Sequence, residues 1–62
     1  MKLISTREMI FALEISAVSL YAWIKEGLPV IRQNPYIFTD KSLDWIVKNK
    51  PNYAKKAKKL EG

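Results

Sequence analysis

The sequence contains no cysteine, no histidine and only two glycines among its 62 residues. Disulfides and the usual zinc ligand sets are therefore excluded. The commonest general base and the best thiol nucleophile are also missing, and two isolated glycines do not form a phosphate-binding loop. We therefore expect that the protein is not an enzyme and uses neither a metal nor another cofactor.

Long apolar runs are missing too. No run approaches the roughly 20 residues that a membrane helix needs, and the N-terminal residues lack the apolar segment of a signal peptide. Hydrophobic residues still make up 48% of the chain, which is enough for one compact core in a domain of this size. The sequence predicts one small cytoplasmic domain without membrane contact.

Positive charge is concentrated near the C-terminus. Residues 1–48 carry six basic and five acidic side chains, whereas residues 49–62 carry five basic side chains and one acidic one. A basic segment favours a polyanionic partner, either nucleic acid or an acidic membrane surface, or else it only keeps the chain soluble. We expect nucleic acid, with Lys55 and Lys56 near the phosphates.

Two helices joined by a short turn are expected in the first half of the chain. The run Ser5-Thr6-Arg7-Glu8 has the form of a capping box and predicts a helix over residues 6–13. Ser16 is a natural N-cap and predicts a second helix over residues 17–26, which Gly27 ends. The apolar stripe of the second helix consists of Leu20, Trp23 and Ile24. This arrangement is typical of a helix-turn-helix unit.

A short hairpin and a third helix follow. Residues 28–32 and 36–38 are rich in β-forming side chains, and the Gln33-Asn34-Pro35 turn separates them. Thr39 or Asp40 then caps a helix that reaches Asn49. The predicted fold is α+β, mainly α: a winged helix-turn-helix with three helices and a short two-stranded wing in residues 1–50. The basic tail, residues 51–62, has weak helical spacing.

The most specific motif runs from Trp23 to Val30, with the sequence Trp-Ile-Lys-Glu-Gly-Leu-Pro-Val. Trp23 anchors the second helix to the core, Gly27 turns the chain, and Leu28-Pro29 starts the hairpin. Together with Ser5-Thr6-Arg7-Glu8, Ile15-Ser16 and Tyr36-Ile37-Phe38, this motif resembles the MerR-like winged-helix family. The resemblance covers residues 3–49. It is greatest to phage and mobile-element excisionases and to the DNA-binding domains of phage terminase small subunits.

The resemblance implies that the second helix enters the major groove while the wing touches phosphates or the minor groove. Phosphate contacts are also expected from cations at helix starts and in the tail. The implied DNA-binding residues are Ser16, Ala17, Val18, Ser19, Tyr21, Ala22 and Lys25 on the second helix, Arg32 and Asn34 in the wing, and Arg7, Lys41, Lys55 and Lys56 elsewhere.

The sequence departs from the family pattern at the recognition helix and at the turn. The family often has arginine where this chain has Ala17, Val18 and Ala22, so thymine methyl contacts replace bidentate guanine contacts. Glu14 stands where glycine is common in the turn. Either Glu14 adopts a left-handed conformation or the turn differs.

The expected function is duplex DNA binding by an excisionase-like or transcription-regulatory factor of a phage or mobile element. Such a protein would be nucleoid-associated in a bacterial cell and would bind itself, by dimerisation or cooperative assembly, or another mobile-element protein. One alternative is the DNA-recognition domain of a terminase small subunit. Another is a protein-interaction module of the same fold, docking through Phe11, Val18, Ala22 and Trp45.

Three aromatic side chains need a separate interpretation. Trp23 lies on the apolar stripe and is expected in the core. Tyr21 is either at the rim of the core or in contact with DNA. Trp45 lies on the far side of its helix from Leu43, so it either packs with Tyr53 under the C-terminal segment or marks a partner surface.

Overall fold

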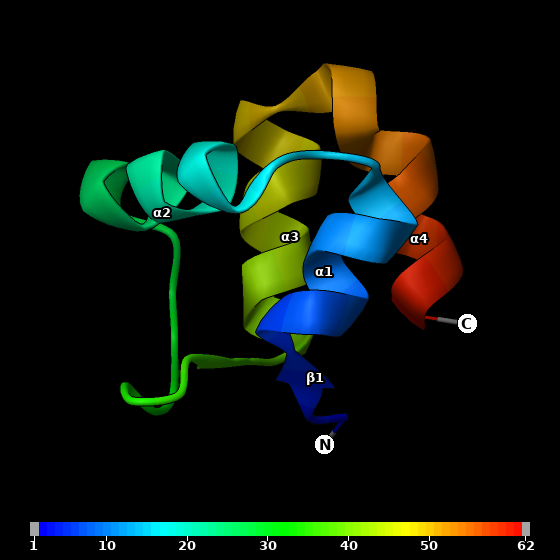
Figure 1. Ribbon diagram of the computed structural model, residues 1–62. Helices are drawn as coiled ribbons and strands as arrows, with labels where there is room; N and C mark the ends of the chain where they lie inside the picture. The colour runs from blue at the N-terminus through cyan, green and yellow to red at the C-terminus, as the bar shows by residue number, and fades with distance from the viewer. Residues whose placement is uncertain (1, 62) are drawn as a thin grey trace.

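The N-terminal capping box starts helix α1 (Thr6–Leu13) in the computed structural model, which describes residues 2–61 (Figure 1). The Ser5 hydroxyl accepts a hydrogen bond from the Glu8 backbone N–H at 3.2 Å. The Glu8 carboxylate accepts one from the Ser5 N–H at 3.4 Å. The helix ends at Glu14, whose φ of 55° and ψ of 46° are left-handed. The predicted bounds of this helix are confirmed, and the turn keeps its form because Glu14 takes the conformation that glycine favours.

Helix α2 (Ala17–Glu26) also has the predicted bounds. Its N-cap, Ser16, accepts a hydrogen bond from the Ser19 backbone N–H at 3.1 Å. Gly27 ends the helix with a φ of +126°, a backbone conformation that side chains with a Cβ rarely adopt. The chain then leaves the helix in a loop that begins at Leu28.

The prediction that residues 28–32 form the first strand of the wing is wrong. Strand β2 (Ile37–Phe38) pairs instead with strand β1 (Ile4–Ser5) in an antiparallel two-stranded sheet. The loop retains one isolated bridge, between Arg32 and Ile37. Pro29 has no N–H to donate to a ladder. The N-terminal segment offers β2 a short partner whose Ile4 side chain is fully buried.

Helix α3 (Asp40–Asn49) ends where predicted, and Thr39, one of the two predicted candidates, is its N-cap. A 3₁₀ turn, η1 (Pro51–Tyr53), then leads into helix α4 (Ala54–Glu61). Residues 2–61 thus form four α-helices and a two-stranded sheet, rather than three helices and a hairpin. The fold is α+β and mainly α.

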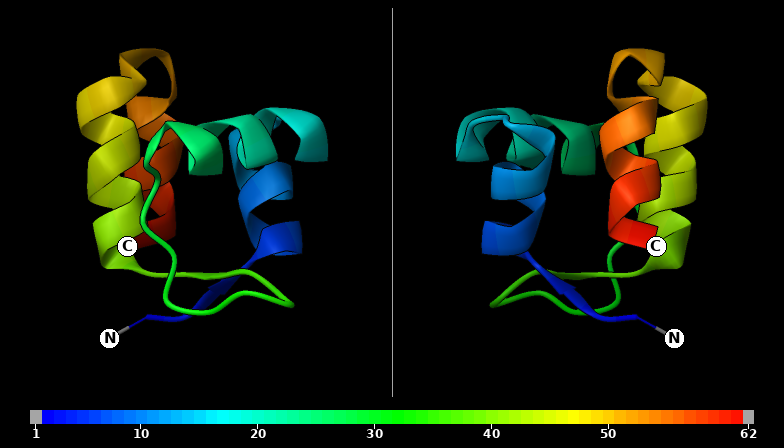
Figure 2. Two further views of the ribbon diagram at one scale, coloured as in Figure 1. Left: turned by 90° about the vertical axis from the view of Figure 1, so that its left-hand side faces the viewer. Right: turned by 90° about the vertical axis from the view of Figure 1, so that its right-hand side faces the viewer.

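Helix α4 is part of the packed domain and not a free tail. It packs against α3 and α1, and its Ala57 is fully buried. Helices α1 and α3 lie in the middle of the molecule, with α2 and the loop that follows it on one side and α4 on the other (Figure 1). The turned views agree, because α2 and this loop face one viewer and α4 faces the other (Figure 2).

The core lies between these elements and includes Trp23, which is 7% exposed, as predicted. The edge of Trp23 packs against Tyr53, with ring centroids 5.2 Å apart. Tyr53 therefore pairs with Trp23, whereas one of the two interpretations paired it with Trp45, which is half-buried against the core. The buried apolar side chains are Ile4, Met9, Leu13, Leu20, Trp23, Leu28, Phe38, Leu43, Ile46 and Ala57. Within residues 2–61, every helix is too short or too polar to cross a bilayer.

Candidate nucleic-acid interface

The outer face of α2 is open to solvent. Leu20 and Trp23 turn one side of the helix toward the core. The opposite side exposes Val18, which is 77% accessible, and Tyr21, which is 45% accessible. Ala22 and Lys25 are exposed on the same helix. We call Val18, Tyr21, Ala22 and Lys25 the outer face of α2.

Tyr36 joins this face to the loop that follows α2. The Tyr36 and Tyr21 rings lie 5.7 Å apart between centroids. The Tyr36 carbonyl accepts a hydrogen bond from the Thr6 hydroxyl at 3.3 Å. Tyr36 thus contacts α2 through its ring and the start of α1, which carries the exposed Arg7, through its carbonyl. In the sequence Tyr36 belongs to a β-rich run, and no local pattern indicates this linking position.

The loop of residues 28–36 descends from the end of α2 and crosses the molecule beneath this helix (Figure 2). Both of its predicted contact residues, Arg32 and Asn34, are exposed. Asn34 has a φ of 57°, which asparagine tolerates better than most residues. The outer side of the loop is therefore open to solvent.

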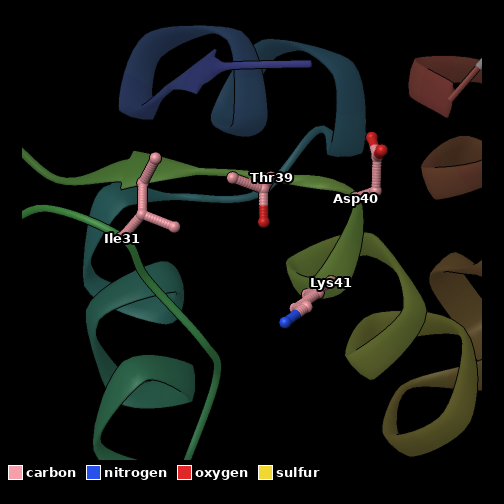
Figure 3. Close-up of a pocket in the computed structure, with 4 residues that line it drawn as sticks. All are labelled: Ile31, Thr39, Asp40 and Lys41. Atoms are coloured by element: carbon pink, nitrogen blue, oxygen red, sulfur yellow. The ribbon is translucent and has the colours of Figure 1, made fainter. Parts of the chain in front are cut away.

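Lys41 lies where the loop meets α3. With Ile31, Thr39 and Asp40 it lines a pocket of about 220 Å³. The Lys41 ammonium group and the Asp40 carboxylate point to different sides of the first turn of α3 (Figure 3). Lys41 therefore adds a cation beside the base of the loop, without neutralisation by its acidic neighbour.

The first turn of α2 uses its hydroxyl groups for capping. The Ser16 hydroxyl accepts from the Ser19 N–H and also donates to the Ser19 hydroxyl at 3.2 Å. Ser16 is exposed, whereas Ser19 and Ala17 are partly buried. These residues shape the start of the helix, and Ser16 is the one best placed to reach a phosphate as well.

The predicted tail contacts do not join the α2 site. Lys55 is exposed on α4, and this helix lies across α1 and α3 from α2 (Figure 1). Lys56 forms an ion pair with Glu14 at 2.7 Å. The predicted DNA-binding residues thus fall into two groups, one around α2 and its loop and one on α4.

The ion pair has an electrostatic consequence for the turn between α1 and α2. The hydrogen bond and the charge of Lys56, with a smaller contribution from the charge of Lys59, lower the pKa of Glu14 below its usual value of 4.5. Glu14 is therefore ionised at neutral pH, and its ion pair with Lys56 holds it against α4. The link ties the left-handed turn to the C-terminal helix.

Replacing Glu14 with glutamine should lower the melting temperature slightly near neutral pH and leave it unchanged in strong acid. The folded-state pKa is lowered, so the ion pair stabilises the fold above the unfolded-state value of 4.5. That contribution disappears as the pH falls through the folded-state pKa. Thermal melts across this range test the prediction. Glu61→Gln, which removes an exposed carboxylate without an ion pair in residues 2–61, is the control. A pH-independent difference for Glu14→Gln would contradict it.

Comparisons of the chain with models of protein families, with curated proteins and with solved structures give no match.

Proposed function

We propose that the protein binds duplex DNA as a small winged helix-turn-helix module, with α2 in the major groove and the loop of residues 28–36 acting as the wing. The observation that carries this proposal is the contact between Tyr21 and Tyr36. It joins the loop to a helix whose outer face is uncovered. The major groove is about 12 Å wide and admits an α-helix about 10–12 Å across.

Within this proposal, the small apolar side chains of the outer face of α2 determine how DNA is read. Val18 and Ala22 can pack on thymine methyl groups but offer no hydrogen bonds to base edges. Lys25 and Arg32 supply charge for phosphates on either side of the groove. Glu26, beside Lys25, repels phosphate little because Lys50 pairs with it at 3.0 Å.

This chemistry favours modest sequence discrimination by a single copy. A protein of this kind gains specificity by cooperative assembly on repeated sites. That behaviour suits an excisionase-like or transcription-regulatory factor of a mobile element, the role that the family resemblance implies. The terminase alternative needs a dimerising helix after Lys50. Helix α4 instead buries Ala57 against its own chain, which favours the first role.

A second candidate function is protein docking through the outer face of α2 together with Phe11 of α1. The observation that favours it is the exposure of large apolar side chains, with Phe11 at 75% and Val18 at 77%. Exposed apolar patches can mark protein interfaces. Salt separates the two functions, because phosphate contacts weaken steeply with salt and an apolar interface does not.

Neutralising Lys25 or Arg32 should make DNA binding less sensitive to salt. Each phosphate contact contributes about 0.9 to the slope of log affinity against log salt concentration. Lys25→Gln and Arg32→Gln should each reduce the slope by about that amount, with similar losses on unrelated duplexes. Fluorescence anisotropy of labelled duplexes over a salt series measures the slope. Lys48→Gln, an exposed lysine of α3, is the matched control. A wild-type protein without measurable duplex affinity at low salt would overturn the proposed function.

A further inference from the structure

Helix α4 carries a basic surface that the α2 site does not use. At 100° per residue, Lys55 and Lys59 lie about 160° around the helix from the buried Ala57. Lys58 is exposed as well. Within residues 2–61, none of these three lysines forms an ion pair. We call Lys55, Lys58 and Lys59 the lysine face of α4.

Contacts between distant parts of the chain bring one further cation and one carboxylate to this surface. Lys2 donates a hydrogen bond to the Leu60 carbonyl, which places another cation at the end of α4. Glu14, in the turn after α1, pairs with Lys56. Helix α4 itself carries four lysines and Glu61, a net charge of +3. Lys2 and Glu14 offset one another, so the surface around α4 keeps this net positive charge.

The lysine face of α4 and the outer face of α2 lie on opposite sides of the molecule. Helices α1 and α3 stand between α2 and α4 in Figure 1, and the two views of Figure 2 each bring one of them forward. The lysine face also points away from Ala57, and so away from the core. A duplex seated on α2 therefore leaves the lysine face open.

We propose that the lysine face of α4 binds the phosphates of a second DNA segment, so that one chain bridges two duplexes. This inference rests on the proposed function, because α2 and its loop hold the first duplex. The lysine face matches the charge of a phosphate backbone, which is bound largely through lysine and arginine. Contacts between its lysines and phosphates carry no sequence information, so the second contact is independent of sequence.

The burial of α4 argues for DNA over an acidic membrane. A helix that binds a membrane surface inserts an exposed apolar side into the lipid. The apolar side of α4 is covered by its own chain, since Ala57 is fully buried and Leu60 is partly buried against the core. Helix α4 thus offers charge without an apolar side to insert.

The test is a capture experiment with two duplexes. One unlabelled duplex is immobilised on beads, a second fluorescent duplex is in solution, and the retained fluorescence is measured over a salt series. The triple variant Lys55→Gln, Lys58→Gln and Lys59→Gln is compared with its arginine counterpart, which keeps the charge. Substitution is preferred to deletion of residues 51–62, because deletion would also remove the buried Ala57.

Wild type and the arginine variant should retain the fluorescent duplex. The glutamine variant should still bind the immobilised duplex but lose most of this retention. Loss of each phosphate contact should lower the salt slope of retention by about 0.9. Equal retention by the glutamine variant would overturn the inference, and so would a wild type that binds one duplex and never captures a second.

Two further results separate the possible failures. A wild type that binds neither duplex would overturn the proposed function along with the inference. Vesicles containing phosphatidylserine are tested in parallel. Wild-type binding to these vesicles without duplex capture would assign the lysine face to membranes and overturn bridging.

Discussion

Trp23→Ala should leave the protein largely unfolded at room temperature. Trp23 is 7% exposed and packs on Tyr53, and the Lys50 ammonium lies 5.6 Å from the Trp23 ring centroid. Truncating a buried aromatic side chain to alanine typically costs about 3–5 kcal/mol. A single core at this chain length rarely supplies more than about 3–5 kcal/mol in total. The free energy lost with this one side chain is therefore comparable to the whole free energy of unfolding.

Thermal melts followed by far-UV circular dichroism test this expectation. Tyr21→Ala is the matched control, because Tyr21 is an aromatic residue of the same helix but is 45% exposed. Tyr21→Ala should fold and melt cooperatively, because it removes only the packing of this ring against Tyr36. A cooperative melt of Trp23→Ala near the wild-type temperature would mean that α2 does not pack through this residue.

Val18→Glu should abolish sequence-dependent DNA binding while the protein stays folded. Val18 is 77% exposed and lies in the first turn of α2, where a carboxylate interacts favourably with the helix dipole. In the major groove the same carboxylate would face phosphates and repel them. The expected discrimination of the wild type is at or below the roughly 1–3 kcal/mol of a good bidentate contact, and the variant should lose it.

The measurement is the ratio of affinities for a preferred duplex and a scrambled one. Phe11→Glu is the control, because it adds the same charge at a position of α1 that is 75% exposed. Its ratio should equal that of the wild type. If folded Val18→Glu keeps the wild-type ratio, α2 does not read DNA, and protein docking through this face becomes the better hypothesis.

Helix bounds were predictable because short-range interactions define them. Ser5 and Ser16 each cap a helix through a backbone N–H three residues further on. The left-handed Glu14 and Gly27 end the two helices just after their last turns. A pattern that a few neighbouring residues satisfy can be recognised without knowledge of the rest of the fold.

The exposure of the α2 site followed from the same local information. Once Leu20 and Trp23 are assigned to the core, the helical period places Val18 and Lys25 on the outer side. The structure has this arrangement.

The pairing of β1 with β2 and the packing of α4 against the domain were not predictable from local patterns. Residues 28–32 and residues 4–5 both contain β-forming side chains, and local pattern alone favoured the nearer segment as the partner of β2. The longer-range pairing forms because Ile4 is buried in the core, whereas Pro29 weakens the nearer segment as a strand. The spacing of residues in the sequence does not show which of the two segments is the more stable partner of β2.

The position of α4 depends on contacts between residues far apart in the chain. Its helical spacing was visible, but the burial of Ala57 against α1 and α3 was not. The ion pair of Lys56 with Glu14 and the hydrogen bond of Lys2 to Leu60 join segments that no local pattern relates. The free energy that these contacts contribute to folding comes from packing and charge in the assembled fold. For this reason the charge of the C-terminal segment was evident from composition, while its direction away from α2 required the three-dimensional structure.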